Sequence, residues 1–429
     1  SKNHKKDDFY IPIYWREDRH QYILDAVISG AIGYIISKKY NQRDEVIKKS
    51  MEINPNIIIL EVEEINQAIY KLAMQQREKN LNIPIIAVTG SVGKTSTCEM
   101  ISSIMKQERN VLSDRGNNNT KVLLSWLMLD LEEYEMAGLE AGIGDKNVMD
   151  PIAKLLRPSI VIINNIGTAH IERLGSRDSI LKEKIQLTQY MQDKKIVCLN
   201  NDDDILKEVK LDDTYHIMKY SLSEAKNIEQ KEDHIVFETE VYGKYTKFCI
   251  LAYGIHNISN AICAIRIGEL LNVKKENIQK GILEYRGVDR RFQVIKKNNY
   301  IIIDDTYNAS LTSMQAGLLT ANEINECKRK IAVLGEMLEL GEYSQELHCK
   351  VGETFQELNF DILLTQGKNT KYICESAKKY MQNKTIVNFQ NQEDLICYLL
   401  ENVKEQDLIY LKASKKMNFN KIVQRLLEK

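Results

Sequence analysis

Apolar runs of strand length alternate with helical stretches over much of the chain. Residues 83–89 (IPIIAVT) are continuously apolar, as in a strand that is buried on both faces. Further apolar runs follow at 158–165 and 196–199, with helical patterns between them. Alternation of strand and helix predicts a doubly wound parallel sheet in this part of the chain.

A second series of the same kind begins near residue 294. Its apolar runs lie at 300–305, 330–335, 361–367 and 407–412, again with helical stretches between them. The series predicts a second α/β domain, of the Rossmann-like type.

Two other regions have different patterns. Residues 1–80 contain short apolar runs at 34–36 and 57–60 within helical patterns, which predicts a small α/β unit. Residues 233–251 form two β-rich halves around a glycine, which predicts a hairpin.

We therefore expect an α/β protein of three domains. They are a small N-terminal domain at 1–81, a central parallel-sheet domain at 82–292, and a C-terminal Rossmann-like domain at 293–429.

Charge and cysteine usage exclude several classes of function. The 59 Lys and Arg residues balance 60 Asp and Glu residues, so the net charge is −1 and gives no bulk attraction to nucleic acid or to membrane surfaces. No two of the eight cysteines have the CxxC spacing of a zinc site, and no apolar window reaches the length of a membrane span. We expect a monomeric cytoplasmic protein that acts on small molecules, without nucleic-acid or membrane partners.

Residues 89–97 (TGSVGKTST) carry the strongest chemical signal. They lie between the buried run at 83–89 and a helical stretch at 98–106, which is the context of a phosphate-binding loop. Glycines at 90 and 93 allow backbone N–H groups to face inward, at a helix N-terminus that carries partial positive charge. Lys94 can reach the phosphates of ATP, and the Thr95 hydroxyl can bind Mg²⁺. The alternative is an ordinary strand–helix turn that is rich in small residues.

Other polar residues follow predicted strands. Glu140 and His170 each follow an apolar stretch, and Asp305, Tyr307 and Asn308 follow another. Ligands of open α/β sheets gather at the carboxyl ends of strands, so these side chains should face one cleft. Carboxylate and imidazole groups there suit a second divalent cation. Taken singly, Glu140 could equally be a solvated loop acid, and His170 a capping or surface histidine.

The spacing of TG and GKT in the loop is similar to that of the Mur ligase family. Segments that resemble the family's motifs extend over nearly the whole chain: GNNNT at 116–120, GLEAG at 138–142, NNIGTAHIERLGS at 164–176, KEKIQL at 182–187, GIHNISNA at 254–261, DDTYNAS at 304–310 and LGEMLELG at 334–341. The chain departs from the family's pattern around Tyr14 and Trp15, at Thr120 and Gln186, and at Ala413 and Lys415 in the final segment KASK (412–415). The resemblance implies that the N-terminal domain binds a substrate of the nucleotide-sugar type, that the central domain is P-loop ATPase-like and binds ATP, and that the C-terminal domain binds the incoming amine.

The same resemblance implies an ATP-dependent, ADP-forming amide ligase. Such an enzyme phosphorylates a carboxylate to an acyl phosphate, which an amine then attacks. The chain is most similar to members that add D-alanyl-D-alanine to a UDP-N-acetylmuramoyl peptide in peptidoglycan precursor synthesis. We thus expect a carboxylate donor and an amino acid or dipeptide as substrates.

Two alternatives compete with this function. The first is a ligase of the same mechanism with another donor or amine, of a natural-product or polyglutamyl type. It is favoured because the chain opens inside the expected first domain, so we expect that domain to be shortened. The second is a nucleotide-binding protein that has lost catalysis. Joint retention of the expected catalytic residues argues against it: Lys94, Glu140, His170, Lys184 and Arg291.

The resemblance also assigns roles to individual residues. It places Arg291 at the ATP phosphates and Asn257, with Asn260 three residues later, on the adenine side. It implies a carbamylated Lys184, whose oxygens would bind a metal. Without the resemblance, Lys184 reads as a solvated helix lysine, Arg291 as half of a linker charge pair, and Asn257 as a capping residue.

The full set of expected site residues is as follows. Nucleotide-binding residues are Gly90, Ser91, Gly93, Lys94, Thr95, Ser96, Asn257, Asn260, Arg291, Asp305, Tyr307 and Asn308. Ligands of two Mg²⁺ ions are Thr95, Glu140, His170 and Lys184. Substrate-binding residues are Asn117, Asn119, Thr168, Glu336 and Glu339, and His348 is expected beside the incoming amine. Glu339 and His348 could instead be plain helix residues.

Overall fold

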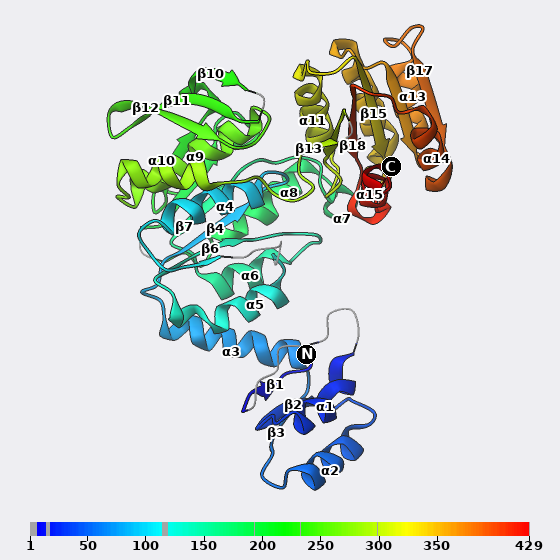
Figure 1. The fold of residues 1–429 in the computed structure, drawn as a ribbon. Coiled ribbons are helices and arrows are strands. Elements are labelled where there is room, and N and C mark those ends of the chain that lie inside the picture. The colour runs from blue at the N-terminus through cyan, green and yellow to red at the C-terminus, as the bar shows by residue number, and fades with distance from the viewer. Residues whose placement is uncertain are drawn as a thin grey trace. The chain divides into compact units, whose positions relative to one another are not determined.

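The structure is a computed structural model that describes residues 7–13, 18–113, 119–192, 194–231, 233–297 and 299–428. The chain forms two compact units (Figure 1). The first comprises Ser1–Ile83 with Thr120–Glu133, and the second comprises Pro84–Asn119 with Tyr134–Lys429. The expected domain divisions at 81/82 and 292/293 stay predictions.

The first unit is built on a parallel sheet of three strands. Its strand order is β1 (Phe9–Tyr10), β2 (Gly33–Ser37) and β3 (Ile58–Val62). Its helices are α1 (Ile23–Ile28), α2 (Arg43–Ile53), α3 (Ile65–Lys79) and α5 (Lys121–Leu129). Alternate residues of β2 enter two separate cores: Tyr34 and Ile36 pack with α1 and α2, whereas Ile35 packs with α3. The two strands expected in this region are confirmed.

The second unit begins with a six-stranded parallel sheet. Its order is β5 (Val111–Ser113), β6 (Met136–Glu140), β4 (Ile85–Thr89), β7 (Ile160–Ile163), β8 (Ile196–Asn200) and β9 (His216–Tyr220). Strand β4 leads into the phosphate loop and lies between β6 and β7. The residues that follow β6 and β7 therefore flank that loop.

One hydrophobic core joins this sheet to the helices and the hairpin of the central region. The helices are α4 (Lys94–Met105), α9 (His256–Leu270) and α10 (Lys275–Glu284), which pack together. The predicted hairpin is confirmed as β11 (Ile235–Val241) and β12 (Lys244–Ile250), and β10 (Lys226–Gln230) adds a third antiparallel strand. Inward residues such as Phe237 and Phe248 join the same core. Helices α6 (Met149–Leu156), α7 (Ile171–Leu174) and α8 (Arg177–Ile185) complete the region.

The C-terminal part of the second unit has its own six-stranded sheet. The order is β13 (Gln293–Lys297), β14 (Tyr300–Asp304), β18 (Asp407–Lys412), β15 (Arg329–Gly335), β16 (Ile362–Gln366) and β17 (Thr385–Phe389), with only β13 antiparallel. Its helices are α11 (Leu311–Glu323), α12 (Ser344–Glu353), α13 (Lys371–Ala377), α14 (Gln392–Asn402) and α15 (Asn420–Glu428). All four strands expected here are confirmed. Within the part of the chain that the structure describes, no helix has the length and apolar content to cross a membrane.

Candidate active site

The phosphate loop forms at the expected strand–helix junction. Gly93 adopts φ +79°, and α4 begins at the next residue, Lys94. A Cβ atom at Gly93 would lie 2.8 Å from Asn260 Oδ1, so both backbone conformation and space require glycine. The Lys94 ammonium folds back to donate to Gly90 O at 2.9 Å. Burial lowers the pKa of Lys94, and the charge of Arg291 lowers it further against the opposing effect of Glu140.

The side chain of Asn165 holds the phosphate loop from the neighbouring strand end. Its Oδ1 accepts hydrogen bonds from Ser91 N and Val92 N, both at 2.9 Å, and its Nδ2 donates to Val92 O at 3.1 Å. Gly167 N adds a hydrogen bond to Ser91 Oγ at 2.9 Å. The sequence prediction missed Asn165, although two consecutive asparagines directly after a buried strand were a usable signal.

The segment that carries Asn165 is itself fixed by charged side chains. Asp203 Oδ2 accepts from Ile166 N at 2.9 Å, while Arg177 donates to Ile166 O through Nε and Nη2 at 2.9 and 2.7 Å. Arg177 also pairs with Asp204. Asp203 and Arg177 therefore immobilise the peptide that follows Asn165, and neither residue was predicted.

Glu140 lies at the end of β6 and is only 3% exposed, so the alternative of a solvated loop acid is wrong. Asn119 Nδ2 is 3.5 Å from its Oε2, and the carboxylate is near enough to Lys94 to raise the pKa of that lysine. Asn117, the other expected substrate residue of this segment, lies outside the described residues.

His170 faces the C-terminal part of the unit. Its Nδ1 lies 2.6 Å from Glu339 Oε2, and Lys416 Nζ is 3.3 Å from the other oxygen of that carboxylate. Glu172 N also donates to Glu339 O at 3.2 Å. His170 occupies the N-cap position of α7, as its capping alternative expected, but its half-buried ring makes no capping hydrogen bond and contacts Glu339 instead. The alternative of a helix residue is wrong for Glu339, which lies in the loop after β15.

Electrostatics keep the His170 ring neutral and the Glu339 carboxyl ionised near neutral pH. Burial has the largest effect and lowers the pKa of His170, the hydrogen bond and charge of Glu339 offset part of that effect, and the charges of Lys94 and Lys184 lower the pKa slightly further. Burial alone would raise the pKa of Glu339, but the hydrogen bonds from His170 and Lys416 lower it overall. A neutral ring that donates through Nδ1 leaves the Nε2 lone pair available to a ligand or cation.

Lys184 is 2% exposed within α8, so the alternative of a solvated helix lysine is wrong. No hydrogen bond or ion pair of its ammonium group occurs among the described residues. Burial, followed by the positive charge of Lys94, holds the pKa of Lys184 well below its usual value. Its surroundings therefore favour the uncharged form of the amine.

Arg291 connects the C-terminal part of the second unit to the phosphate loop of its central region, so the alternative of a linker charge pair does not describe it. Its Nη2 donates to Thr95 Oγ1 at 2.7 Å, and its guanidinium lies 4.5 Å from the ring centroid of Tyr307. Arg290 and Lys415 approach the same ring at 5.7 and 5.1 Å. Three cationic side chains therefore lie around the Tyr307 ring, beside the phosphate loop.

A cavity of about 1030 Å³ connects these elements. The expected site residues that line it are Ser91, Gly93, Lys94, Ser96, Asn119, His170, Asn257, Asn260, Arg291, Asp305, Tyr307 and Asn308. Those that do not line it are Gly90, Thr95, Glu140, Thr168, Lys184, Glu336 and Glu339.

The two expected adenine-side asparagines have different surroundings. Asn257 Nδ2 donates to Tyr253 O at 2.7 Å at the start of α9. Asn260 Oδ1 accepts from Thr97 Oγ1 at 3.1 Å, so Asn260 packs against the phosphate loop. Thr168 has a buried hydroxyl with no hydrogen-bond partner in the described part of the chain.

Glu336 lies in the loop that follows β15, and His348 lies in helix α12, as its alternative interpretation as a helix residue expected. Glu336 Oε1 accepts from Asn369 N at 2.6 Å. His348 is fully buried, with Nδ1 donating to Ser344 O at 2.6 Å and Nε2 accepting from Met337 N at 3.1 Å. His348 therefore supports this loop with both ring nitrogens and does not present either to a substrate.

Comparison with known proteins agrees with this architecture. Residues 88–268 match the Mur ligase middle domain, and residues 290–415 match the domain described as "Mur ligase, glutamate ligase domain". The UDP-N-acetylmuramoyl-tripeptide–D-alanyl-D-alanine ligase of Rickettsia prowazekii is 30% identical over 433 residues, which is 99% of this chain and 93% of the relative. The enzyme of the same name from Bacillus subtilis is 28% identical over 96% of this chain and 88% of its own.

Solved structures extend the comparison to the fold. A crystal structure of MurF from Acinetobacter baumannii has TM-score 0.85 and 27% identity, and the match covers 100% of this chain and 92% of that one. MurF from Thermotoga maritima, solved in complex with ADP, has TM-score 0.81 at 23% identity, covering 100% and 96% of the two chains. The predicted fold class, with a central parallel-sheet domain and a C-terminal α/β domain, is confirmed. By sequence and by fold, the chain belongs to the Mur ligase family.

Proposed function

We propose that this chain is an ATP-dependent peptide ligase that joins D-alanyl-D-alanine to UDP-N-acetylmuramoyl-tripeptide in peptidoglycan precursor synthesis. The observation that carries the ligase chemistry is the hydrogen bond from Arg291 to Thr95, which brings a cation from outside the central sheet to the phosphate loop. The substrates are inferred from the names of relatives that align along almost the whole chain.

The reaction has two steps. An oxygen of the substrate carboxylate attacks the γ-phosphorus of ATP, the bond to the β–γ bridging oxygen breaks, and ADP leaves. The amine of the dipeptide then attacks the acyl carbon, inorganic phosphate departs, and the nitrogen loses a proton. Lys94 and Arg291 flank the phosphate loop, where they neutralise the charge of the transferring phosphoryl group.

The residues present fit magnesium. Within the described ranges there is no cluster of three or more His, Cys, Asp or Glu residues that could hold a metal ion. Mg²⁺ uses few protein ligands, however, and completes its shell with phosphate and water oxygens. Thr95 and Glu140 would hold one ion, which would neutralise phosphate charge.

We assign the second magnesium ion to His170 and Lys184. Buried Lys184 has a depressed pKa, and an uncharged amine is the form that reacts with carbon dioxide. A carbamate on Lys184 would turn a buried amine into an anion with two oxygens for a metal. Glu339 orients His170 from the side of Nδ1, which suits a ligand role for Nε2.

The remaining site residues complete the proposal. Asn257 and the residues after β14, namely Asp305, Tyr307 and Asn308, border the nucleotide. Asn119, Thr168, Glu336 and Glu339 border the carboxylate and amine substrates. We also propose that the enzyme acts as a monomer in the cytoplasm, where its eight cysteines stay reduced.

A substrate matrix tests the function. The protein is incubated with ATP and Mg²⁺, each of several UDP-muramyl peptides, and D-alanyl-D-alanine, D-alanine or L-glutamate, and products are read by mass spectrometry. The proposal requires one product, the tripeptide donor plus dipeptide minus water, with one ADP formed per bond. Preference for another donor or for single glutamates would indicate a related ligase instead. ATP hydrolysis that ignores every substrate would indicate a nucleotide-binding protein without ligase activity.

A further inference from the structure

The segment that carries Arg291 has an unfavourable backbone. Arg290 and Phe292, on either side of it, adopt φ values of +58° and +54° in the left-handed region. Non-glycine residues, and bulky ones above all, persist there only when their surroundings hold them. The orientation of Arg291 towards Thr95 therefore depends on whatever fixes its two neighbours.

Asp305 fixes the segment from the C-terminal sheet. Its Oδ1 accepts from Phe292 N at 3.2 Å, and Tyr307 N donates to Arg290 O at 3.0 Å. The Phe292 ring lies between Tyr253 and Tyr410, with centroid distances of 6.1 and 6.0 Å. Both strained residues are thus tied to the loop that follows β14.

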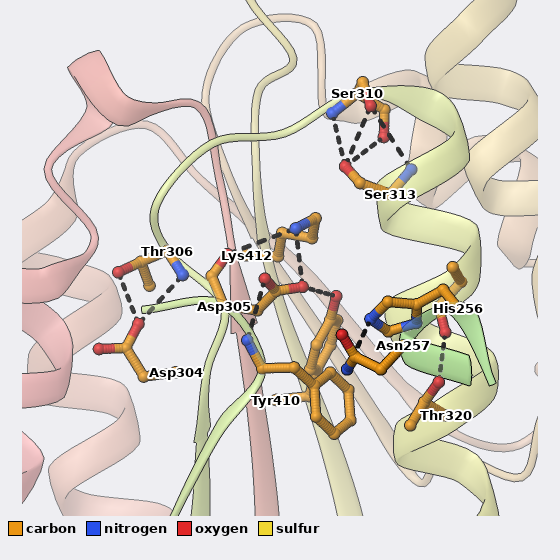
Figure 2. A network of polar contacts seen from close by, with 12 residues as sticks. His256, Asn257, Asp304, Asp305, Thr306, Ser310, Ser313, Thr320, Tyr410 and Lys412 are labelled. Carbon is orange, nitrogen blue, oxygen red and sulfur yellow. Dashed lines mark hydrogen bonds and ion pairs between the residues drawn. The ribbon is translucent and has the colours of Figure 1, made fainter. Parts of the chain in front are cut away.

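The other oxygen of Asp305 is held by two buried residues of β18. Lys412 Nζ lies 2.7 Å from Oδ2, and the Tyr410 hydroxyl donates to the same atom at 2.9 Å (Figure 2). Strand β18 pairs with β14, and residues two apart on a strand share one face, so Tyr410 and Lys412 both reach the carboxylate. Protein donors therefore occupy both oxygens of Asp305.

Gly317 of α11 leaves the space that this contact needs. A Cβ atom at residue 317 would overlap the Tyr410 hydroxyl and would lie 3.0 Å from Asp305 Oδ2. Because the hydroxyl cannot stay in place beside a methyl group, even alanine at this position would push Tyr410 away from Asp305.

We propose that Tyr410 and Lys412 are positioning residues for Arg291. They hold the Asp305 carboxylate, which holds the Phe292 amide, and this chain of contacts aims the Arg291 guanidinium at the phosphate loop. The proposal rests on the proposed ligase function, and it assigns catalytic importance to two buried residues that do not contact the phosphate loop themselves.

The decisive variant is Tyr410→Phe, because it removes one hydroxyl and keeps the ring beside Phe292. Its matched control is Tyr300→Phe, since the Tyr300 hydroxyl is buried in the same sheet and donates to Leu426 O at 2.7 Å. Both variants should lose similar thermal stability. Only Tyr410→Phe should lower kcat, by roughly tenfold, with KM for ATP changed less than about twofold, because Arg291 acts mainly on the transferring phosphoryl group.

A double-variant cycle tests whether the effect passes through Arg291. Adding Tyr410→Phe to Arg291→Ala should lower kcat no further, whereas independent residues would give multiplied effects. Gly317→Ala should reproduce the kcat loss of Tyr410→Phe without removing any polar group. A multiplied effect, or equal kcat in Tyr410→Phe and Tyr300→Phe, would overturn the proposal.

Amide hydrogen exchange separates this inference from the ligase function itself. Exchange at the Phe292 amide should accelerate in Tyr410→Phe and stay at the wild-type rate in Tyr300→Phe, whether or not the wild-type protein ligates the chosen substrates. Unchanged exchange at Phe292 in Tyr410→Phe would refute the positioning role. A wild-type protein without ligase activity would refute only the proposed function.

Discussion

Replacing Asn165 with alanine should disable the phosphate loop without unfolding the protein. The side chain makes three hydrogen bonds to the loop, accepting from Ser91 N and Val92 N and donating to Val92 O. Alanine removes all three. It retains the hydrogen bond from Ser91 N to the backbone carbonyl of residue 165, which measures 3.2 Å.

The size of the effect follows from those contacts. A hydrogen bond of this kind contributes about 1 kcal/mol net, so three contribute about 3 kcal/mol, and the retained backbone contact and entering water reduce the loss to about 2–3 kcal/mol. If the loop must be ordered to bind and position phosphate, that loss lowers kcat/KM for ATP by about 30- to 150-fold. The cores lie elsewhere, so the melting temperature should fall by only a few degrees.

Phosphate release with saturating donor and amine measures kcat/KM for ATP, and two further variants control the result. Asn402→Ala removes a single hydrogen bond on α14 and should keep wild-type kinetics. Asn165→Asp keeps an acceptor for Ser91 N and Val92 N but adds a negative charge beside the phosphates, so it should raise KM for ATP more than it lowers kcat. A kcat/KM within threefold of wild type for Asn165→Ala would refute the reasoning.

Three further outcomes are expected. Lys94→Ala should lower kcat by about 10²- to 10³-fold with an unchanged circular dichroism spectrum, and near-wild-type turnover would remove the phosphate-loop assignment. Lys184→Met should have a higher melting temperature than wild type at pH 7 without bicarbonate, because the buried amine with a lowered pKa binds fewer protons in the folded than in the unfolded state. The free energy of unfolding of the wild type therefore rises with pH by up to about 1.4 kcal/mol per pH unit, so the difference in melting temperature should close towards pH 10. A difference that widens with pH would contradict this explanation. Glu339→Gln should move the acid limb of the kcat/KM profile to lower pH, because the carboxylate raises the pKa of His170, and a shift to higher pH would show that His170 is not the titrating group.

The parts of the site that could be predicted from the sequence are formed by residues that are adjacent along the chain. The phosphate loop occupies one strand–turn–helix, in which Gly93 and Lys94 are adjacent. Glu140 was found because the end of a predicted parallel strand marks the ligand edge of a sheet. Both inferences need only local pattern and one general rule of sheet topology.

What could not be predicted depends on contacts between distant segments. Asn165 meets Val92 across 73 positions, so the two consecutive asparagines after β7 mark candidates without specifying which side chain holds the loop. Local pattern does not distinguish Lys184 from Lys182, two residues earlier; the family resemblance selected Lys184, and the packing of α8 is what buries it. His348 carries the residue type of a catalytic group, but its neighbours use both ring nitrogens for backbone support.

Left-handed backbone occurs at fifteen non-glycine positions of the described residues, and four of them belong to the contacts that assemble the site. His170 (φ +61°) and Glu339 (φ +63°) bond to each other, and Arg290 and Phe292 flank the arginine that reaches Thr95. Each such residue costs about 1–2 kcal/mol relative to an ordinary conformation, and glycine would avoid that cost. Glycine could not supply the imidazole of His170, the carboxylate of Glu339, the ring of Phe292 or the guanidinium that Arg290 places over the Tyr307 ring, so contacts that only the side chains can make offset the strain. We conclude that these four positions are constrained by assembly of the site and not by stability of either sheet.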